Sequence, residues 1–277
     1  MTVAEAPDRY ALFGHPVMHS WSPFIHGMFA QQFDHDIQYR LIDATPDRFR
    51  KAVIDFFVEG GRGINVTVPH KQAAAELVND LTQRAQRAGA VNTIFVPDST
   101  TLIGDNTDGA GLVKDLTANL GLNLHGRRIL VLGAGGAVRG VLAPLLRQRP
   151  AVLHIANRTP ARAEDLAEEF ADLGKIAASG FAAAAAQPWD LMINATSASL
   201  TGDVPELDGS ALAPETVCYD MSYGHGETPF QRWARAHGAT MLHKGWGMLV
   251  EQAAEAYFLW RGVRPDTRPV LDALTAH

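Results

Sequence analysis

The chain has a single cysteine, Cys218, so no disulfide can form within it. Cys218 stands in the apolar run Val217-Cys218-Tyr219, where we expect a buried and unreactive thiol. No apolar run approaches the roughly 20 residues that a membrane-spanning helix needs. The first nine residues are acidic and lack the apolar core of a signal peptide. These absences favour a cytoplasmic protein.

Positive charge is also scarce. The 277 residues include 24 Lys and Arg against 30 Asp and Glu, which gives a net charge of -6 at pH 7. This balance argues against a dedicated nucleic-acid surface and gives no reason to expect binding to an anionic membrane. A small anionic ligand stays compatible with it, because a local site can oppose the overall sign. Internal repeats and low-complexity linkers are lacking as well.

Strand and helix signals alternate through the first hundred residues. Ser22-Pro23 and Thr45-Pro46 each pair an N-cap with a proline at the first helical position, so each predicts the start of a helix. We expect strands at 10–13, 38–42, 63–68, 90–96 and 101–103, the last two joined by a Pro-Asp-Ser turn. The alternation predicts a mostly parallel α/β sheet.

A second α/β series follows Gly121. We expect its strands at 128–132, 152–156, 191–194, 217–221 and 240–242, with helices between them. A last long helix over about 248–260 ends at Gly262. Because 277 residues exceed most single hydrophobic cores, we predict an α/β protein of two domains.

Residues 63–71 (GINVTVPHK) join a strand to a probable helix. Read with a period of two, the apolar residues face one way while Asn65 and Thr67 face the other. Pro69 ends the strand, and Lys71 falls in the first turn of the helix, where α/β proteins place their ligand crevice. Two hydrogen-bonding side chains and one ammonium thus converge. The alternative is an edge strand with a wet face and a solvated lysine.

Residues 130–139 (LVLGAGGAVR) read as a buried strand, a glycine-rich turn and a helix. Gly133 permits the tight turn, and Gly135 lets a pyrophosphate approach backbone N–H groups at the helix N-terminus. Val138 occupies the position of the third small residue, so the motif is imperfect. At the head of a βαβ unit it still favours a dinucleotide site over a plain tight turn.

The second strand of this unit ends at Asn157-Arg158-Thr159, without the Asp or Glu that usually binds the ribose of NAD. Arg158 and Arg162 would offer two guanidinium groups to a 2'-phosphate, which favours NADP. Thr159 also reads as the N-cap of the next helix, and Arg162 could be simple surface charge.

A nicotinamide cofactor leaves the protein to supply a substrate pocket and a proton source. The loop at 104–109 connects the first α/β series to the second. We expect Asp108 of this loop to face a cleft between the domains, together with Lys71. In the alternative, Asp105 or Asp108 only forms a turn or caps a helix. We interpret the histidines at 15, 19, 26 and 70 as packing or loop residues, and no spacing predicts a metal site.

In their order along nearly the whole chain, these motifs resemble the shikimate dehydrogenase family. The matching segments are 13–16, 19–23, 63–71, 88–93, 104–109, 133–139, 157–159, 194–197 and 247–253. The resemblance implies a reversible, NADP-dependent reduction of 3-dehydroshikimate to shikimate, a small-molecule substrate of the pathway to aromatic amino acids. It also implies that Lys71 and Asp108 are the catalytic pair.

The resemblance further assigns binding residues. For the substrate carboxylate it implies Ser20 and Ser22 with Tyr223 nearby, and for the ring hydroxyls Asn65, Thr67, Asn92 and Gln252. For NADP it implies Gly133, Ala134, Gly135, Gly136, Ala137, Asn157, Arg158, Thr159, Arg162, Met221, Gly245 and Met248. The family fold implies a substrate-binding domain over 1–108, completed by 245–277, and a Rossmann domain over 109–244.

Two positions depart from the family pattern, Trp21 between the two serines and Lys244 before Gly245, and both bear on substrate preference. One alternative is a quinate/shikimate dehydrogenase, which accepts quinate and often prefers NAD. Another is a noncatalytic dinucleotide sensor, which would be expected to lose the lysine or the aspartate. A homodimer is also left open, since no self-complementary seam stands out in the sequence.

Overall fold

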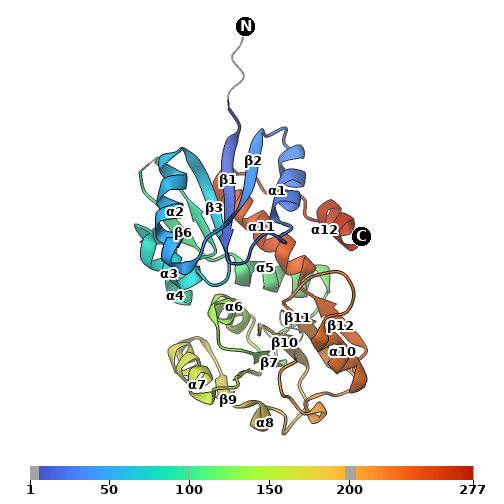
Figure 1. Cartoon of the computed structure of the whole chain (residues 1–277). Coiled ribbons are helices and arrows are strands. Elements are labelled where there is room, and N and C mark those ends of the chain that lie inside the picture. Colours follow the sequence, from blue (N-terminus) through green and yellow to red (C-terminus); the bar gives the residue numbers. More distant parts are fainter. Residues whose placement is uncertain (1–5, 99, 197–203, 277) are drawn as a thin grey trace. The chain divides into compact units, whose positions relative to one another are not determined.

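The computed structural model describes residues 6–98, 100–196 and 204–276 (Figure 1). The chain divides into two compact units. Unit 1 comprises the described residues up to Gly111 together with Val250–Ala276, and unit 2 comprises the described residues of Leu112–Leu249. The division falls within two helices, α5 (Asp108–Lys114) and α11 (Trp246–Arg261). Ser99 of the predicted Pro-Asp-Ser turn and Ser197 of the matching segment 194–197 lie outside the described residues.

Unit 1 contains a six-stranded sheet in the order β2-β1-β3-β5-β6-β4. Its strands are β1 (Asp8–Gly14), β2 (Ile37–Asp43), β3 (Gly61–Val66), β4 (Asp80–Leu81), β5 (Thr93–Phe95) and β6 (Ile103–Asp105). β1 pairs in parallel with β2 and β3, as the alternating pattern predicts. β5 is antiparallel to β3 and to β6, so this sheet is mixed. The inversion arises because β5 and β6 form the predicted strand pair across a turn.

The helices of unit 1 are α1 (Ser22–Gln31), α2 (Pro46–Val58), α3 (Lys71–Leu77), α4 (Gln83–Ala88), α12 (Arg268–Thr275) and the unit 1 portions of α5 and α11. All of them except α4 and α12, which were not predicted, begin close to their predicted starts. Thr45 is the N-cap of α2, as predicted. The predicted N-cap Ser22 is wrong: Trp21 is the cap and Ser22 lies in the first turn. The backbone N–H of Ser22, which has no partner within the helix, donates to Ser20 Oγ at 3.2 Å.

The two faces of the unit 1 sheet bury different side chains. Ile64 and Val66 of β3 pack with Phe49 of α2 in one cluster. On the opposite face Gly63 lies against Trp260 of α11, because a Cβ at position 63 would fall 2.4 Å from the Trp260 Nε1 atom. The Trp260 ring also stacks on Tyr10 of β1 at 4.7 Å. The period-two prediction is confirmed within β3, but the strand ends at Val66 rather than at residue 68.

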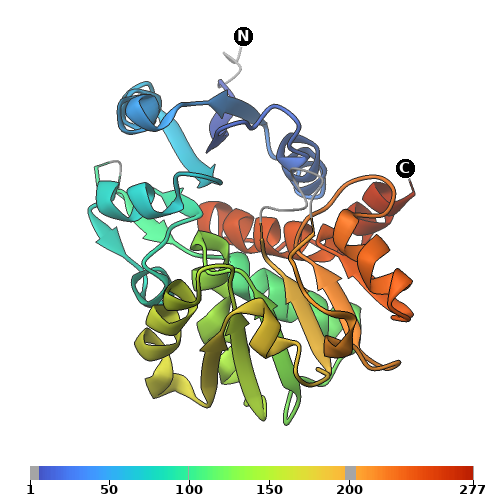
Figure 2. The same ribbon diagram turned by 60° about the horizontal axis from the view of Figure 1, so that its bottom comes forward.

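Unit 2 contains a six-stranded sheet in the order β12-β11-β10-β7-β8-β9, and every pair in it is parallel. Its strands are β7 (Arg128–Leu132), β8 (Val152–Ala156), β9 (Ile176–Ser179), β10 (Leu191–Asn194), β11 (Val217–Asp220) and β12 (Met241–Lys244). They run side by side in Figure 2. The order reverses between β7 and β10, which is the switch point of a doubly wound Rossmann sheet, where dinucleotides bind.

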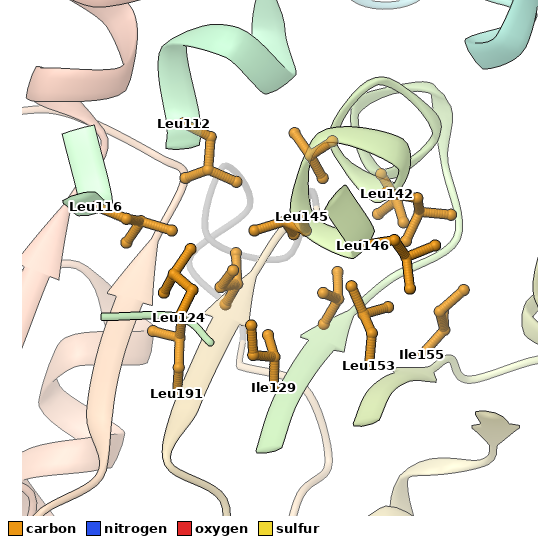
Figure 3. Close-up of a cluster of buried hydrophobic side chains, with 14 of the residues drawn as sticks. Leu112, Leu116, Leu124, Ile129, Leu142, Leu145, Leu146, Leu153, Ile155 and Leu191 are labelled. Carbon is orange, nitrogen blue, oxygen red and sulfur yellow. The ribbon is translucent and has the colours of Figure 1, made fainter. Parts of the chain in front are cut away.

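Helices cover both faces of the unit 2 sheet. They are α6 (Gly136–Arg147), α7 (Pro160–Glu169), α8 (Phe181–Ala184) and α10 (Pro229–Ala236), and short helical turns lie at Asp115–Asn119, Ala171–Leu173 and Gly209–Ala211. Leu142, Leu145 and Leu146 of α6 pack onto one face (Figure 3). Phe230 and Ala234 of α10 pack onto the other. This two-sided burial explains why the strands of unit 2 read as continuous apolar runs.

The elements β4, α4, β9 and α12 were not predicted. β4 and β9 are short and have no strong apolar alternation, and α12 follows the last predicted helix. The segment predicted as one helix over 110–120 contains a π-helical turn at Asp115–Asn119. Among the described residues, no helix is long and apolar enough to cross a membrane.

The packing of Gly63 on Trp260 generates a prediction about stability. Gly63→Ala would place a methyl group inside the Trp260 ring, and such overpacking costs about 1–3 kcal/mol. Gly27→Ala is the matched control, because a Cβ at position 27 in α1 meets nothing within 4 Å. That control is expected to stabilise the protein by about 0.5–1 kcal/mol. Urea unfolding of both variants measures the difference, and equal stabilities would contradict the packing.

Candidate functional site

A buried ion pair joins two segments that lie 37 residues apart in unit 1. Lys71 Nζ donates to Asp108 Oδ2 at 2.5 Å, and the two side chains are only 13% and 7% exposed. Lys71 is the first residue of α3, and Asp108 is the first residue of α5. The lysine is therefore not a solvated surface charge, which was the alternative to a functional role.

Asn92 fixes the other side of the carboxylate. Its Nδ2 donates to Asp108 Oδ1 at 2.8 Å, so each oxygen of Asp108 accepts from a different partner. Asn92 Nδ2 also lies 3.2 Å from Gln252 Oε1 and 2.9 Å from Thr107 Oγ1. The backbone N–H of Thr107 donates to Asn92 Oδ1 at 2.8 Å. Of the predicted site residues, Asn92 thus contacts the ion pair directly, and Gln252 contacts Asn92.

A close helix contact places Gln252. A Cβ on Gly111 of α5 would lie 2.6 Å from the backbone nitrogen of Gln252 in α11, so only glycine permits this approach. The second carboxylate of the loop, Asp105, has a different environment. Arg84 binds it through two nitrogens at 2.6 and 2.7 Å, and Thr82 donates to it at 2.6 Å. Asp105 therefore serves as a structural anchor for Arg84.

Asn65 is buried at the end of β3, with 5% of its surface exposed. Its Nδ2 donates to Thr93 Oγ1 at 3.1 Å and lies 3.4 Å from the backbone oxygen of Asn92. Its Oδ1 accepts from the hydroxyl of Tyr39 at 2.7 Å. The alternative of a solvent-exposed strand face is thus wrong at Asn65, because this residue is buried. Thr67 follows one residue beyond the strand and is half-buried.

The predicted carboxylate ligands lie apart in the chain and fall in different units. Ser20 and Ser22 stand at the start of α1, with Ser20 Oγ donating to Ser22 Oγ at 3.1 Å. Tyr223 belongs to unit 2, where its ring lies 5.2 Å from Trp246. Lys244, one of the two departures, donates to the backbone oxygens of Gly224 and Gly226 and so holds the loop that carries Tyr223.

The glycine turn of unit 2 stands at the switch point of its sheet. Gly133 follows β7 with φ +111°, a conformation that favours glycine, and a Cβ there would lie 3.2 Å from the Ala195 oxygen after β10. Gly135, the N-cap of α6, is exposed, and a Cβ there would meet nothing within 4 Å. Ala134, Gly136 and Ala137 complete the turn. This open helix N-terminus fits a pyrophosphate.

The residues after β8 fit a phosphorylated ribose. Arg158 and Arg162 are both exposed, and no carboxylate stands between β8 and Arg162. Asn157 Nδ2 donates to the Thr159 oxygen at 2.9 Å, and Thr159 is the N-cap of α7, as predicted. Arg139, by contrast, pairs with Glu169 and is engaged in structure. Val138, which replaces the third small residue, is buried in the core of unit 2.

The three remaining predicted cofactor residues cluster at the ends of β11 and β12. Gly245 approaches Met221 so closely that a Cβ on Gly245 would lie 2.3 Å from the Met221 oxygen. Met248, in the first turn of α11, is buried in the core of unit 2. Nearby, the buried Asp115 accepts from the Tyr219 hydroxyl at 2.6 Å. Burial and then the Asp115 carboxylate raise the pKa of Tyr219 well above its usual value.

The histidines and the cysteine have structural environments. His70 Nε2 donates to the Ala44 oxygen at 2.7 Å, and its ring stacks on Phe49 at 4.3 Å. His26 is fully buried, and burial lowers its pKa to about 3 while the Asn65 side chain acts in the opposite direction. Cys218 is buried as predicted, and burial raises its pKa to about 12. Within the described residues no group of acidic, histidine and cysteine side chains could hold a metal ion.

The sequence analysis did not identify three residues that hydrogen-bond to Asn65 or Asn92, namely Tyr39, Thr93 and Thr107. Thr107 lies in the loop at 104–109 and Thr93 ends the segment at 88–93. Both segments match the family, so the position of these two threonines in them was a usable signal. Tyr39 gave no usable signal, because most of β2 is only half-buried and shows no clean alternation.

Three segments of the chain match models of known protein families. Residues 12–94 match the shikimate dehydrogenase substrate binding domain, 115–201 match shikimate/quinate 5-dehydrogenase, and 245–275 match the shikimate 5'-dehydrogenase C-terminal domain. A curated shikimate dehydrogenase (NADP(+)) from Methylococcus capsulatus is 55% identical over 98% of this chain and 97% of its own length.

Solved structures show the same fold. Shikimate 5-dehydrogenase from Thermus thermophilus, in complex with NADP(H) and shikimate, is 33% identical with a TM-score of 0.84, over 97% of this chain and 99% of that one. The ligand-free 5-ketofructose reductase of a Gluconobacter strain is 28% identical with a TM-score of 0.83, over 98% and 99%. The predicted two-domain α/β fold is thereby confirmed.

The buried His26 generates a prediction about acid stability. Its pKa of about 3 lies below the ordinary value of 6.5, so below pH 6.5 the unfolded chain binds a proton that the folded chain does not. Stability is therefore lost as pH falls, by about 1.4 kcal/mol per pH unit from this residue. His26→Phe should reduce the loss in unfolding free energy between pH 7 and pH 5 by about 2 kcal/mol. Urea unfolding at both pH values measures this, and an unchanged loss would contradict the assignment.

Proposed function

The chain belongs to the shikimate dehydrogenase family, and from this premise we propose that it catalyses the reversible, NADPH-dependent reduction of 3-dehydroshikimate to shikimate in aromatic amino acid biosynthesis. The observation that carries the proposal is the buried Lys71–Asp108 pair, with both carboxylate oxygens engaged. A noncatalytic sensor would have no need to maintain a buried ion pair of this kind.

The two units divide the work in this proposal. Residues 1–108, completed by 245–277, bind the substrate, and residues 109–244 bind NADP. The doubly wound strand order of unit 2 and its glycine turn support the second assignment. The polar cluster around Asp108 in unit 1 supports the first.

The residues of unit 1 match the chemistry of the carbonyl reduction. NADPH, when bound, would supply the hydride for this reduction. Lys71 stabilises the negative charge that develops on the carbonyl oxygen and donates the proton from Nζ. Asp108 holds that ammonium in place through Oδ2. In the oxidation of shikimate, Lys71 takes the hydroxyl proton back.

Substrate recognition rests on neutral hydrogen-bonding groups. Ser20 and Ser22 bind the carboxylate at the start of α1, with Tyr223 as a third hydroxyl. Asn65, Thr67, Asn92 and Gln252 bind the ring hydroxyls. The dense hydrogen bonding among Asn65, Asn92 and Gln252 supports this role, because it fixes their orientation before a ligand arrives.

Cofactor recognition rests on the turn at 133–137 and on the residues after β8. Gly133, Ala134, Gly135, Gly136 and Ala137 receive the pyrophosphate at the N-terminus of α6. Arg158 and Arg162 bind the 2'-phosphate, while Asn157 and Thr159 shape the loop between them. Met221, Gly245 and Met248, at the ends of β11 and β12, would complete the cofactor site.

We also propose a cytoplasmic location, because the reaction draws on NADPH and on small soluble metabolites. A homodimer is the remaining expectation, for which the sequence shows no self-complementary seam. Sedimentation equilibrium of the purified protein reads the oligomeric state directly, since a dimer doubles the 29.9 kDa mass of the chain.

The direct test is a set of initial rates that crosses shikimate and quinate with NADP+ and NAD+. The proposal requires turnover with shikimate and NADP+. Additional turnover with quinate or with NAD+ would favour the broader quinate/shikimate activity, and no turnover with any pair would favour the sensor. Reduction of 5-ketofructose with NADPH is a further control, because that sugar has no carboxylate for the two serines.

Removal of Lys71 tests the proton donor. Lys71→Ala should lower kcat by about 10²- to 10⁴-fold with a smaller effect on the KM for shikimate, because the ammonium acts mainly in the transition state. Lys51→Ala is the matched control, since Lys51 is exposed and pairs only with Asp55 on the surface of α2. Steady-state kinetics of both variants decide the assignment. Near-normal kcat in Lys71→Ala would refute it.

Removal of Arg158 tests the cofactor preference. Arg158→Gln should raise the KM for NADP+ by about 10- to 100-fold, since hydrogen bonds to a charged group contribute about 1.5–3 kcal/mol. The KM for NAD+ should stay unchanged, because NAD+ has no 2'-phosphate. Arg147→Gln, at the exposed end of α6, is the control. Equal effects on both cofactors would contradict 2'-phosphate recognition.

A further inference from the structure

A chain of hydrogen bonds runs through unit 1 from Tyr39 to Asp108. Tyr39 donates to Asn65 Oδ1 at 2.7 Å, and Asn65 Nδ2 donates to Thr93 Oγ1 at 3.1 Å. The Thr93 hydroxyl donates to Asn92 Oδ1 at 2.9 Å, and Asn92 Nδ2 donates to Asp108 Oδ1 at 2.8 Å. Every proton in this chain points from Tyr39 toward the carboxylate.

Backbone groups fix the direction of the chain. The Thr107 N–H can only donate, and it lies 2.8 Å from Asn92 Oδ1, so that atom must be the acceptor. Asn92 Nδ2 is then the donor to Asp108. Because the single proton of Thr93 is given to Asn92, Thr93 Oγ1 is available to Asn65 only as an acceptor.

The same reasoning fixes the Asn65 amide. Its Nδ2 faces two acceptors, Thr93 Oγ1 and the backbone oxygen of Asn92. A flipped amide would set its oxygen against both of them, which is repulsive. Tyr39 completes the arrangement, because its hydroxyl gives Oδ1 a donor in a position with 5% exposure.

We propose that Tyr39 is a positioning residue of the substrate site, which holds the Asn65 amide so that Oδ1 keeps a lone pair for a hydroxyl of the substrate. The inference rests on the proposed function, in which Asn65 binds a ring hydroxyl. An amide whose two N–H groups are already engaged recognises that hydroxyl as a hydrogen-bond donor. Tyr39 thus reinforces the orientation in which Asn65 accepts rather than donates.

The Tyr39 ring is itself held in place by stacking. It lies flat on the His26 ring, with a centroid distance of 4.5 Å and an interplanar angle of 9°, and it is tilted against Trp260 at 6.3 Å. His26 is neutral at physiological pH, so the stack carries no charge to perturb the hydroxyl. The ring packing and the hydroxyl contact are therefore separable by substitution.

Tyr39→Phe is the test, because it removes the hydroxyl and keeps the ring. We expect the KM for shikimate to rise about tenfold, which corresponds to about 1.4 kcal/mol, while kcat changes less than about threefold. The KM for NADP+ should stay unchanged, and the melting temperature should fall by only a few degrees, because one buried acceptor loses its donor. An unchanged KM for shikimate, or a fall in melting temperature without a KM effect, would overturn the positioning role.

Tyr257→Phe is the matched control from the same aromatic cluster. Tyr257 stacks near His26 as well, but its hydroxyl contacts His35 Nδ1 at 2.6 Å and has no part in the chain from Tyr39 to Asp108. Its removal should leave the KM for shikimate unchanged. A KM effect equal to that of Tyr39→Phe would show that the cluster acts only through packing and would overturn the proposal.

A second readout separates this inference from the proposed function. In protein labelled with ¹⁵N-asparagine, the side-chain amide protons of Asn65 should exchange with water at least about tenfold faster in Tyr39→Phe than in the wild type or in Tyr257→Phe. This result requires no substrate. If the wild type failed to turn over shikimate, faster exchange would still support the positioning role, and unchanged exchange would overturn it.

Discussion

The Asp108 carboxylate is the group on which the candidate site depends. The Asp108 side chain is 7% exposed, and its carboxylate is stabilised by an ammonium at one oxygen and an amide N–H at the other. A buried charge without such partners is unfavourable by several kcal/mol, and removing one partner of a buried pair typically costs about 3–5 kcal/mol. The surrounding amides and hydroxyls are therefore constrained by the need to satisfy Asp108 as well as by any ligand.

The fold meets this need by bringing distant segments to one place in unit 1. Lys71 is the first residue of α3, which follows β3, and Asp108 is the first residue of α5, which follows β6. Gly111 allows α11 to approach α5 so closely that Gln252 reaches Asn92. Gly63 allows Trp260 of the same helix to reach the sheet. Gly63 and Gly111 thus set the position of α11, a helix that begins only at Trp246.

Much of this was predictable from sequence, because it depends on local signals. The period of two in β3 and the glycine turn after β7 follow from spacing and chemistry, and the pairing of Lys71 with Asp108 followed from the family resemblance. The end of β3, the N-cap of α1 and the role of Tyr39 were not predictable. Each depends on a contact with a residue distant in the sequence or on competition between two hydroxyls, which spacing does not encode.

The most direct test of the account is a double-mutant cycle on kcat with Lys71→Gln, Asp108→Asn and the double variant. If Lys71 transfers the proton and Asp108 only orients it, the two residues act as a unit. The double variant should then lose no more activity than Lys71→Gln alone, within about threefold. Losses that multiply would mean that the two residues act independently, and this result would contradict the account.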